Sequence, residues 1–422
     1  MSTIQNLAQA EAALAAFAPE IPAASQYTLE AMTHLMEYLG NPQNQLKIVH
    51  IAGTSGKTST CYFVASLLEE AGFSVGFSVS PHIDSVSERA QVRGVPFTES
   101  DYCQELSDFL KLVKRSNIQV SYFEVLVAFA YWLFAKLKLD YVVMEVGLGG
   151  LLDATNVVSR QDKIDAITDI GFDHTNILGN TIAQITAQKA GIIQEANMVF
   201  VQEQAKEVIA VIMSQCEIKN ATLRVIEAPS VDEETEGVAL FRQRNWHLAR
   251  KVVHYILMRE NHPDLTTTKL QHAAAVYIPG RMEAVTYKNT TVVLDGSHNP
   301  QKLTALVDSM RYVYKDKTIA LLVSFGGNKQ ETVEESLKIL HRLSDSIIVT
   351  SFSTGFGALR PAINVSTLAQ YCKTAGFSDI TILEEPREAF IQLCATPSDI
   401  KLVTGSFYLL NHIRPLIFQK DT

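Results

Sequence analysis

Several features are scarce or missing in the 422-residue sequence, and each absence excludes a class of protein or of binding partner. No uncharged apolar run approaches the ~18 residues of a membrane-spanning helix. Basic charge is not in excess, because the formal net charge is -9, whereas duplex nucleic-acid binders carry a basic face. The first 25 residues lack a basic segment before an apolar core and predict an amphipathic helix instead of a signal peptide. We therefore expect neither a membrane nor a nucleic-acid partner.

Cysteine is also scarce. The five cysteines are odd in number, scattered, and form no C-x-x-C pair: Cys61, Cys103, Cys216, Cys372 and Cys394. This pattern disfavours a disulfide framework or a paired-cysteine zinc site and favours reduced thiols. Together with the missing signal peptide, it predicts a cytoplasmic protein.

Short apolar runs alternate with longer segments of helical period. Strands are predicted over residues 46–52, 73–79, 141–146 and 163–170, with helices over 58–72 and 123–138. Such alternation is typical of a parallel sheet covered on both faces. A second series of predicted strands occupies residues 290–295, 318–325, 346–352, 380–383 and 400–405.

The length exceeds that of one ordinary core, and the Pro279-Gly280 pair interrupts regular structure between the two series. We predict an α/β protein of two domains. Residues 1–278 form a larger phosphate-loop domain with a mainly parallel sheet flanked by helices, and residues 279–422 form a smaller Rossmann-like α/β domain. The acidic segment 231–237 is predicted to be a solvated loop.

The strongest local signal is a glycine-rich loop between a predicted strand and a predicted helix. It comprises Gly53, Thr54, Ser55, Gly56, Lys57, Thr58 and Ser59. Glycines let backbone N–H groups approach phosphate oxygens, and the helix N-terminus favours negative charge. Lys57 would reach the β- and γ-phosphates, and the Thr58 hydroxyl would hold Mg²⁺. An ordinary strand–helix turn is the alternative, since Ile51 stands where the general motif has its first glycine.

Further motifs follow in a characteristic order over nearly the whole chain. They are Ser80-Pro81-His82, Ser87-Glu88-Arg89, Glu145-Val146-Gly147, Asp153-Ala154-Thr155-Asn156, Asp173-His174, Lys189-Ala190-Gly191, Gln243-Arg244-Asn245, Pro279-Gly280-Arg281 and Asp295-Gly296-Ser297-His298-Asn299-Pro300. The shorter G-T-x-G-K-[ST] loop is similar to that of the Mur-ligase superfamily. The set as a whole resembles the folylpolyglutamate synthase/dihydrofolate synthase family.

The resemblance implies a role for each motif. Glu145 would bridge two Mg²⁺ ions, with Thr58 on the first and Ser80 and His174 on the second. Lys189 matches a lysine that family members can carry as a carbamate, the alternative being a plain lysine that balances carboxylates. With Lys57, the residues Glu145, His174 and Lys189 are the implied catalytic set.

The remaining implied contacts concern ATP and the folate substrate. Asn245 resembles an adenine contact, Arg281 a phosphate contact, and the Asp295–His298 pair the contact to ribose and phosphates. The implied substrate residues are Ser80, Pro81, His82, Arg89, Asp153, Thr155 and Asn156. The sequence departs from the family pattern at Leu151, where Arg is usual, at Asn328-Lys329-Gln330, where Asp-Lys-Asp is common, and at Thr58, where Gly or Ser is more frequent.

These motifs imply an ATP- and Mg²⁺-dependent ligase that joins L-glutamate to the carboxylate of dihydropteroate or a reduced folate through an acyl phosphate. Both activities in one enzyme, or only one of them, fit the sequence. A phosphate-loop kinase or nucleotide switch, a Mur-type peptidoglycan ligase and a non-catalytic paralogue also stay open as functions. The resemblance favours a monomer and leaves a monovalent cation requirement open.

Overall fold

The computed structural model describes residues 4–17, 28–227, 237–353 and 361–418. The chain divides into two compact units, the first made of residues 1–236 and 242–276 and the second of residues 237–241 and 277–422. The change at 276/277 lies two residues before the predicted boundary. The segment 237–241 joins the second unit because Ala239 and Phe241 pack in that unit's hydrophobic core. Most of the acidic segment 231–237 lies outside the described residues.

The first unit is built on a seven-stranded sheet of order β3-β2-β4-β1-β5-β6-β7. All neighbouring strands are parallel except β2 and β3, which are antiparallel at one edge. The strands are β1 (Ile48–Ala52), β2 (Val75–Ser78), β3 (Gln91–Arg93), β4 (Tyr141–Glu145), β5 (Ile164–Ile167), β6 (Met198–Gln202) and β7 (Thr222–Ile226). The predicted mainly parallel sheet is therefore confirmed.

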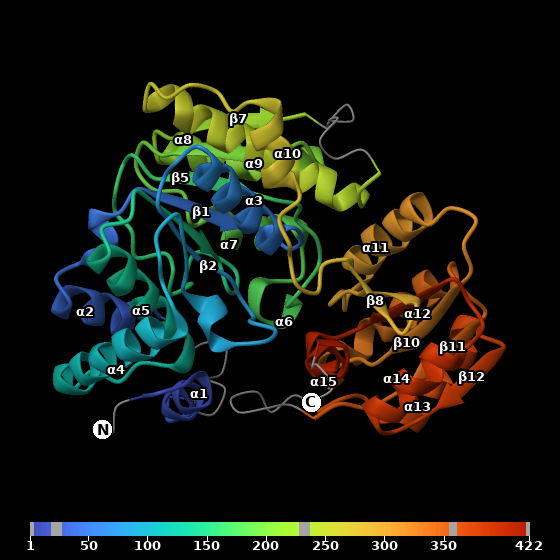
Figure 1. The fold of residues 1–422 in the computed structure, drawn as a ribbon. Helices are drawn as coiled ribbons and strands as arrows, with labels where there is room; N and C mark the ends of the chain where they lie inside the picture. The colour runs from blue at the N-terminus through green and yellow to red at the C-terminus, as the bar shows by residue number, and fades with distance from the viewer. Residues whose placement is uncertain (1–3, 18–27, 228–236, 354–360, 419–422) are drawn as a thin grey trace. The chain divides into compact units, whose positions relative to one another are not determined.

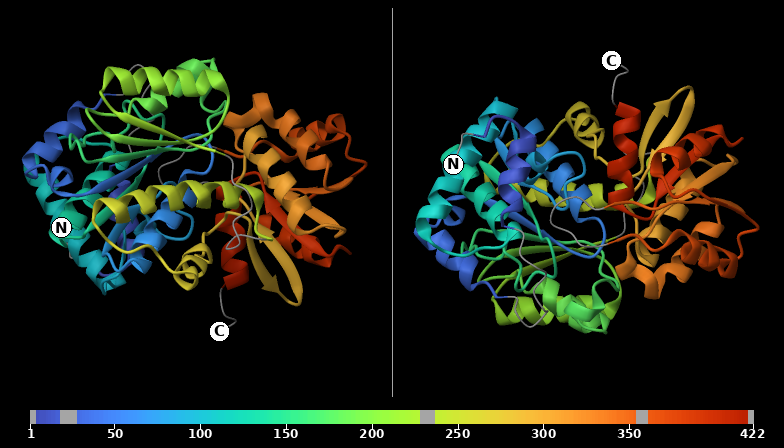
Figure 2. Two further views of the ribbon diagram at one scale, coloured as in Figure 1. Left: turned by 90° about the horizontal axis from the view of Figure 1, so that it is seen from above. Right: turned by 90° about the horizontal axis from the view of Figure 1, so that it is seen from below.

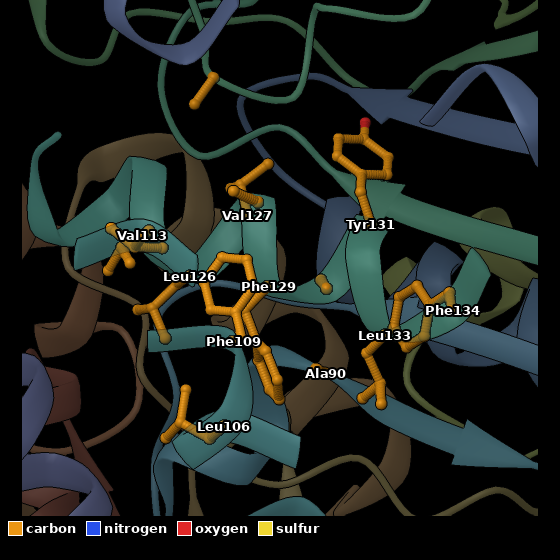
Figure 3. Packing of buried hydrophobic residues seen from close by; sticks show 14 of the residues in the cluster. Ala90, Leu106, Phe109, Val113, Leu126, Val127, Phe129, Tyr131, Leu133 and Phe134 are labelled. Carbon is orange, nitrogen blue, oxygen red and sulfur yellow. The ribbon is translucent and has the colours of Figure 1, made fainter. Parts of the chain in front are cut away.

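Helices cover both faces of this sheet (Figures 1 and 2). They are α1 (Leu7–Ala15), α2 (Glu30–Tyr38), α3 (Lys57–Glu70), α4 (Glu99–Ser116), α5 (Tyr122–Lys136), α6 (Thr175–Leu178), α7 (Ile182–Ala190), α8 (Lys206–Ile218), α9 (Leu240–Arg259) and α10 (Thr267–Ala274). Helix α5 is apolar on nearly every side and is buried, and its Phe129 ring lies beside that of Phe109 (Figure 3). Phe129 also contacts Tyr102 edge-on and stacks on Trp132. A helix that is apolar all round needs partners on all sides, and α1, α2, α4 and the sheet supply hydrophobic residues to the same cluster.

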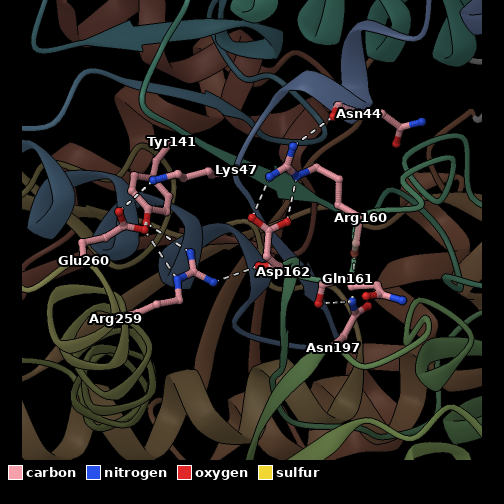
Figure 4. Close-up of polar contacts among 9 residues, drawn as sticks. All are labelled: Asn44, Lys47, Tyr141, Arg160, Gln161, Asp162, Asn197, Arg259 and Glu260. Carbon is pink, nitrogen blue, oxygen red and sulfur yellow. Dashed lines mark hydrogen bonds and ion pairs between the residues drawn. The ribbon is translucent and has the colours of Figure 1, made fainter.

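A network of polar and charged side chains lies at the edge of the first sheet where the parallel strands begin. Tyr141 Oη donates to Glu260 Oε1 at 2.6 Å, and Lys47 Nζ lies 2.8 Å from Glu260 Oε2. Arg259, the last residue of α9, donates to Tyr141 Oη and to the carbonyl of Asp162 (Figure 4). This network ties the C-terminal end of α9 to the starts of β1 and β4 and to the segment before β5.

The second unit contains a six-stranded sheet of order β12-β11-β10-β13-β9-β8, parallel except for the β8–β9 pair. Its strands are β8 (Glu283–Tyr287), β9 (Thr290–Leu294), β10 (Ile319–Val323), β11 (Ser346–Val349), β12 (Asp379–Ile382) and β13 (Ile400–Thr404). Its helices are α11 (Pro300–Val313), α12 (Val333–His341), α13 (Val365–Ala375), α14 (Pro386–Ala395) and α15 (Phe407–Phe418). Two hydrophobic clusters with residues from alternate positions of the central strands lie against the helices. In the described part of the chain, no helix is both long and apolar enough to span a bilayer.

Candidate active site

Four neighbouring parallel strands of the first sheet bring the predicted site residues to one edge. Glu145 is the last residue of β4, and the phosphate loop follows β1 directly. Ser80 comes two residues after β2, and His174 lies between β5 and α6. Because β2, β4, β1 and β5 are adjacent and parallel, their C-terminal ends share the edge at which doubly wound sheets bind ligands.

Backbone contacts to the next strand hold the phosphate loop in shape. The N–H groups of Thr54 and Ser55 both donate to the carbonyl of Asp169, at 2.8 and 3.2 Å. Thr168 Oγ1 donates to the carbonyl of Ser55 at 2.6 Å. The Thr54 and Ser55 amides are therefore used within the protein. The helix begins after Gly56, whose φ of 92° lies in the left-handed region.

Gly56 is also the point where Asn245 meets the loop. A Cβ on Gly56 would lie 2.4 Å from Asn245 Oδ1, so only glycine allows this approach. Asn245 is buried on α9. The predicted adenine contact thus lies directly against the phosphate loop.

Glu145 connects two of the predicted metal-binding residues. Thr58 Oγ1 donates to Glu145 Oε1 at 2.9 Å, and the backbone N–H of Ser80 donates to Glu145 Oε2 at 2.9 Å. The Glu145 side chain is only 3% exposed. A buried carboxylate needs hydrogen bonds or cations as partners, and here a rotatable hydroxyl supplies one of them.

Two lysines converge on one carbonyl of the phosphate loop. Lys57 Nζ donates to the carbonyl oxygen of Gly53 at 3.0 Å, and Lys189 Nζ donates to the same oxygen at 2.9 Å. Lys189 lies on α7 and is buried. The loop therefore carries two ammonium groups close together, an arrangement suited to a strongly anionic ligand.

His174 adopts a left-handed conformation with φ of 51° immediately before the short helix α6. Its Nε2 lies 3.8 Å from the carboxylate of Asp173, whose side chain is largely buried. The same carboxylate accepts the backbone N–H of His174 at 3.1 Å, so Asp173 helps to hold the turn in which His174 lies.

The segment that follows β2 holds the first group of predicted substrate residues. Arg89 Nε donates to His82 Nδ1 at 3.1 Å, and Arg89 Nη1 donates to the carbonyl of Val79. Burial, with a further contribution from the Arg89 charge, lowers the pKa of His82 to about 3, so this ring is neutral. Glu88 accepts backbone N–H groups from residues 83–85 and fixes the turn. The Ser80–Pro81 peptide bond is cis.

The second group of predicted substrate residues is engaged inside its own loop. The Asp153 carboxylate accepts the N–H of Leu148 at 2.8 Å and the hydroxyl of Thr155 at 2.5 Å. Thr155 Oγ1 also contacts His50 Nε2 at 2.8 Å, and Asn156 Nδ2 donates to two backbone carbonyls. Asp153, Thr155 and Asn156 are all buried, so in this structure their side chains shape the loop after Glu145.

In the second unit, the predicted nucleotide contacts gather where β9 ends. Asp295 Oδ2 accepts the N–H of Met282 and Oδ1 accepts the N–H of Ser297, both at 2.8 Å. Burial raises the pKa of Asp295, while the nearby Arg281 charge lowers it. His298 Nδ1 lies 2.8 Å from the carbonyl of Gly296. The three predicted residues Arg281, Asp295 and His298 thus belong to one set of turns.

Both units match known protein families. Residues 51–236 match the Mur ligase middle domain, and residues 280–407 match the Mur ligase, glutamate ligase domain. A dihydrofolate synthetase of Saccharomyces cerevisiae is 30% identical over 418 residues, which cover 91% of this chain and 96% of the yeast protein. The chain belongs to the dihydrofolate synthase/folylpolyglutamate synthase family.

Two further relatives extend the comparison. A Bacillus subtilis dihydrofolate synthase/folylpolyglutamate synthase is 29% identical over 416 residues, covering 92% of this chain and 94% of that protein. The structure of Mycobacterium tuberculosis folylpolyglutamate synthase complexed with ADP and AMPPCP is similar with a TM-score of 0.81 and 26% identity, over 99% of each chain. The family prediction made from the ordered motifs is therefore confirmed.

Sequence reasoning within this family pattern missed two residues that support the phosphate loop. Arg244 forms a two-pronged contact with the Asp169 carboxylate, at 2.7 to 3.0 Å. The backbone of Asp169 in turn holds Thr54 and Ser55. Arg244 stands in the Gln243-Arg244-Asn245 motif, and Asp169 lies at the end of a predicted strand, but their pairing over 75 positions has no signature in one sequence.

Apart from Thr58 in the phosphate loop, the other two departures from the family pattern lie in different surroundings. Leu151, where Arg is usual, is 44% exposed beside Gly191, and a Cβ on that glycine would lie 2.5 Å from the Leu151 side chain. Asn328 lies in the 3₁₀ helix Gly327–Thr332 of the second unit. Neither residue belongs to the phosphate loop.

Proposed function

We propose that this chain is a ligase that uses ATP to join L-glutamate to a folate-type carboxylate, and that one enzyme carries both the dihydrofolate synthase and the folylpolyglutamate synthase activity. The observation that carries the proposal is the family membership over both units, with relatives named for each activity. The buried Glu145, hydrogen-bonded to the phosphate-loop hydroxyl of Thr58, supports it from the structure.

The proposed chemistry has two steps. A carboxylate oxygen of the folate substrate attacks the γ-phosphorus, and the bond from that phosphorus to the ADP oxygen breaks. The amino nitrogen of L-glutamate then attacks the acyl carbon, phosphate leaves, and the nitrogen loses a proton to give the amide. Lys57 and the amides at the start of α3 bind and orient the phosphates, so positioning and electrostatics supply most of the rate. No side chain is assigned as the base.

The residues present fit a divalent cation beside the nucleotide. Thr58, Ser80, Glu145 and His174 would hold two Mg²⁺ ions, whose positive charge would offset charge on the phosphates. In the ranges that the structure describes, no three His, Cys, Asp or Glu residues form a metal cage. Mg²⁺ does not require one, because it is commonly held by one or two carboxylates together with substrate phosphates and water.

A carbamate on Lys189 is part of the proposal. The neutral amine would add to carbon dioxide, forming an N–C bond and releasing a proton, and the product is an anionic carbamate. Because Lys57 and Lys189 donate to the same carbonyl oxygen, this change would replace repulsion between two ammonium groups by attraction. A plain lysine is the alternative, and crystals grown at neutral pH would distinguish the two in well-ordered electron density.

The proposed substrates are ATP, L-glutamate, and dihydropteroate or a reduced folate, with no membrane or nucleic-acid partner. A cytoplasmic location and a monomeric state are proposed as well, the location being supported by five cysteines that are free of disulfides. A phosphate-loop kinase or a nucleotide switch is less well supported, because neither accounts for the matched glutamate ligase domain.

The test is a product assay with purified protein, Mg²⁺-ATP and L-glutamate, with dihydropteroate and tetrahydrofolate offered separately. Mass spectrometry should find one added glutamate on dihydropteroate and extension of tetrahydrofolate. Product from dihydropteroate alone would leave only the dihydrofolate synthase activity, and product from tetrahydrofolate alone would leave only the folylpolyglutamate synthase activity. Addition of glutamate to neither acceptor would overturn it, even if the protein still bound ATP.

A further inference from the structure

The turn that carries Arg281 in the second unit has an unusual backbone. Gly280 and Met282, on either side of Arg281, both have positive φ values, 60° and 47°. Methionine rarely adopts this conformation, because its Cβ crowds the following carbonyl. Surrounding contacts must therefore hold the turn in place.

Two buried carboxylates provide these contacts. Glu283 Oε2 accepts the N–H of Gly280 at 2.8 Å, and Asp295 Oδ2 accepts the N–H of Met282 at 2.8 Å. The carbonyl of Gly280 accepts the N–H of Gly296 at 3.0 Å. The backbone is thus fixed on both sides of Arg281.

Glu283 is itself held by a residue 131 positions away. Arg414 Nη1 donates to Glu283 Oε2, and the side chains of Arg414 and Glu283 are only 4% and 1% exposed. The hydroxyl of Tyr277 also donates to Glu283, and Arg414 Nη2 contacts Tyr277 Oη at 3.2 Å. A carboxylate so deeply buried depends on its counter-charge, so removing Arg414 would leave Glu283 uncompensated.

The helix that carries Arg414 also supports the side chain of Arg281. Phe407, the first residue of α15, lies with its ring centroid 4.3 Å from the guanidinium carbon of Arg281. Phe407 and Arg414 are seven residues apart and thus lie on the same face of α15. Gly296 makes room for the ring, since a Cβ there would lie 2.2 Å from Phe407 Cε1.

We infer that one face of α15 positions Arg281 for the nucleotide, with Arg414 acting through Glu283 on the backbone and Phe407 acting on the guanidinium. Glu283, Arg414 and Phe407 are positioning residues, because they act on the nucleotide through Arg281 and its turn. The inference rests on the proposed function and on the phosphate contact that the family resemblance implies for Arg281. Since Arg281 is the only route assigned to these residues, their effects on ATP must disappear when Arg281 is absent.

A double-mutant cycle tests this dependence. The dissociation constant of ADP and the KM for ATP are measured for Arg281→Ala, Arg414→Met, Phe407→Leu and each pair with Arg281→Ala. We expect Arg281→Ala to raise both constants by about tenfold, as for a lost charge-assisted contact. Arg414→Met and Phe407→Leu should each raise them by about threefold to tenfold, and neither should add a further loss in the Arg281→Ala background.

The controls separate positioning from loss of stability. Asn364→Ala removes the cap of α13, where Asn364 accepts the N–H of Ser366, and should lower the melting temperature without changing the ADP constant. Arg414→Lys keeps the charge and should recover part of the loss. If Arg414→Met fails to fold, the cycle of Phe407→Leu with Arg281→Ala still tests the inference, because Phe407→Leu leaves no buried charge unpaired.

The inference would be overturned if Arg414→Met or Phe407→Leu weakened ADP binding by the same factor in the Arg281→Ala background as in the parent. It would also be overturned if Arg281→Ala left the dissociation constant of ADP unchanged. ADP binding does not require ligation. A protein that shows the expected cycle for ADP but adds glutamate to no acceptor would therefore support the positioning inference and contradict the proposed function.

Discussion

Glu145 in the first unit and Asp295 in the second are both buried carboxylates where a parallel strand ends, but their partners differ. Glu145 accepts a side-chain hydroxyl from the phosphate loop and a backbone N–H from the segment after β2. Asp295 accepts two backbone N–H groups from turns beside it, and the Ser297 side chain adds a further hydrogen bond. A hydroxyl can rotate to face another ligand, whereas backbone amides fixed in a turn cannot. Glu145 is thus suited to exchange a partner on binding, and Asp295 to hold backbone in place.

The largest effect is expected in the phosphate loop, at Lys57. Lys57→Ala should keep the fold and lower ligation by about 10³-fold or more, because the phosphate loop loses the positive charge proposed to bind the γ-phosphate. Steady-state product formation measures the loss, and circular dichroism checks the fold. Lys338→Ala, an exposed lysine paired with Glu334, is the matched control and should leave turnover unchanged. Near-normal turnover of Lys57→Ala would remove the phosphate loop from the mechanism.

Substitution of the two carboxylates should separate their roles. Glu145→Gln should lower turnover by roughly 10²-fold and raise the Mg²⁺ concentration needed, with little change in stability. Asp295→Asn should lower the free energy of unfolding by about 1–3 kcal/mol, since an amide NH₂ would then face a backbone N–H, and should not shift the Mg²⁺ titration. Urea unfolding and Mg²⁺ titrations of turnover measure both effects. The comparison fails if the two variants shift the Mg²⁺ titration equally.

The smallest effect is expected at the other end of the first sheet, at Glu260. Hydrogen bonds, the largest from Lys47 and the next from Tyr141, lower the pKa of Glu260. Because the pKa of Glu260 is lower in the folded protein, its ionised carboxylate stabilises the fold at pH values above the unfolded-state pKa of about 4.3. This stabilisation is lost as the pH falls through the folded-state pKa. Glu260→Gln should therefore lower the free energy of unfolding by about 1 kcal/mol or less at pH 7.

Urea unfolding at pH 7 and at about pH 3.5, below the unfolded value, checks the sign, because the difference between Glu260→Gln and the parent should shrink at the lower pH. Glu334→Gln serves as the control, because it removes an exposed ion pair with Lys338, four residues along the helix. Its free energy of unfolding relative to the parent should not change between the two pH values. A difference that stays constant between the two pH values would show that charge on Glu260 is not the cause.

The sequence predicted the central strands well because strands buried on both faces are continuous apolar runs. Strands β1, β4, β9, β10 and β13 lie within the predicted ranges. The missed strands have weaker patterns: β3 has three half-buried residues, and β7 is mostly exposed. β8, which follows the Pro279-Gly280 turn, alternates in exposure at the sheet edge, and β6 is a short apolar run that periodicity alone does not distinguish from part of a buried helix.

For the site, the motifs include Thr58, Ser80 and Glu145, which lie in contact, but they do not show what supports these residues. The contacts of Thr58 and Ser80 with Glu145 depend on the strand order β2-β4-β1, which the alternation of strands and helices does not determine. The support from Asp169 comes from its carbonyl oxygen, a group that every residue has, so no residue type identifies it. The Glu283–Arg414 pair joins residues 131 positions apart and is equally invisible in a single sequence.

The strand order of the second sheet bears on how the protein is made. Strand β13, one of its two central strands, lies between β9 and β10 but is the last strand to be synthesised, and α15 with Phe407 and Arg414 follows it. While the ribosome is still reading codons before residue 400, β9 and β10 have no strand to join them. A chain that stops before residue 400 therefore lacks the strand that joins β9 to β10 and also lacks Phe407 and Arg414, which contact Arg281 and Glu283. A message truncated near its 3′ end thus removes the centre of the second sheet instead of a few terminal residues.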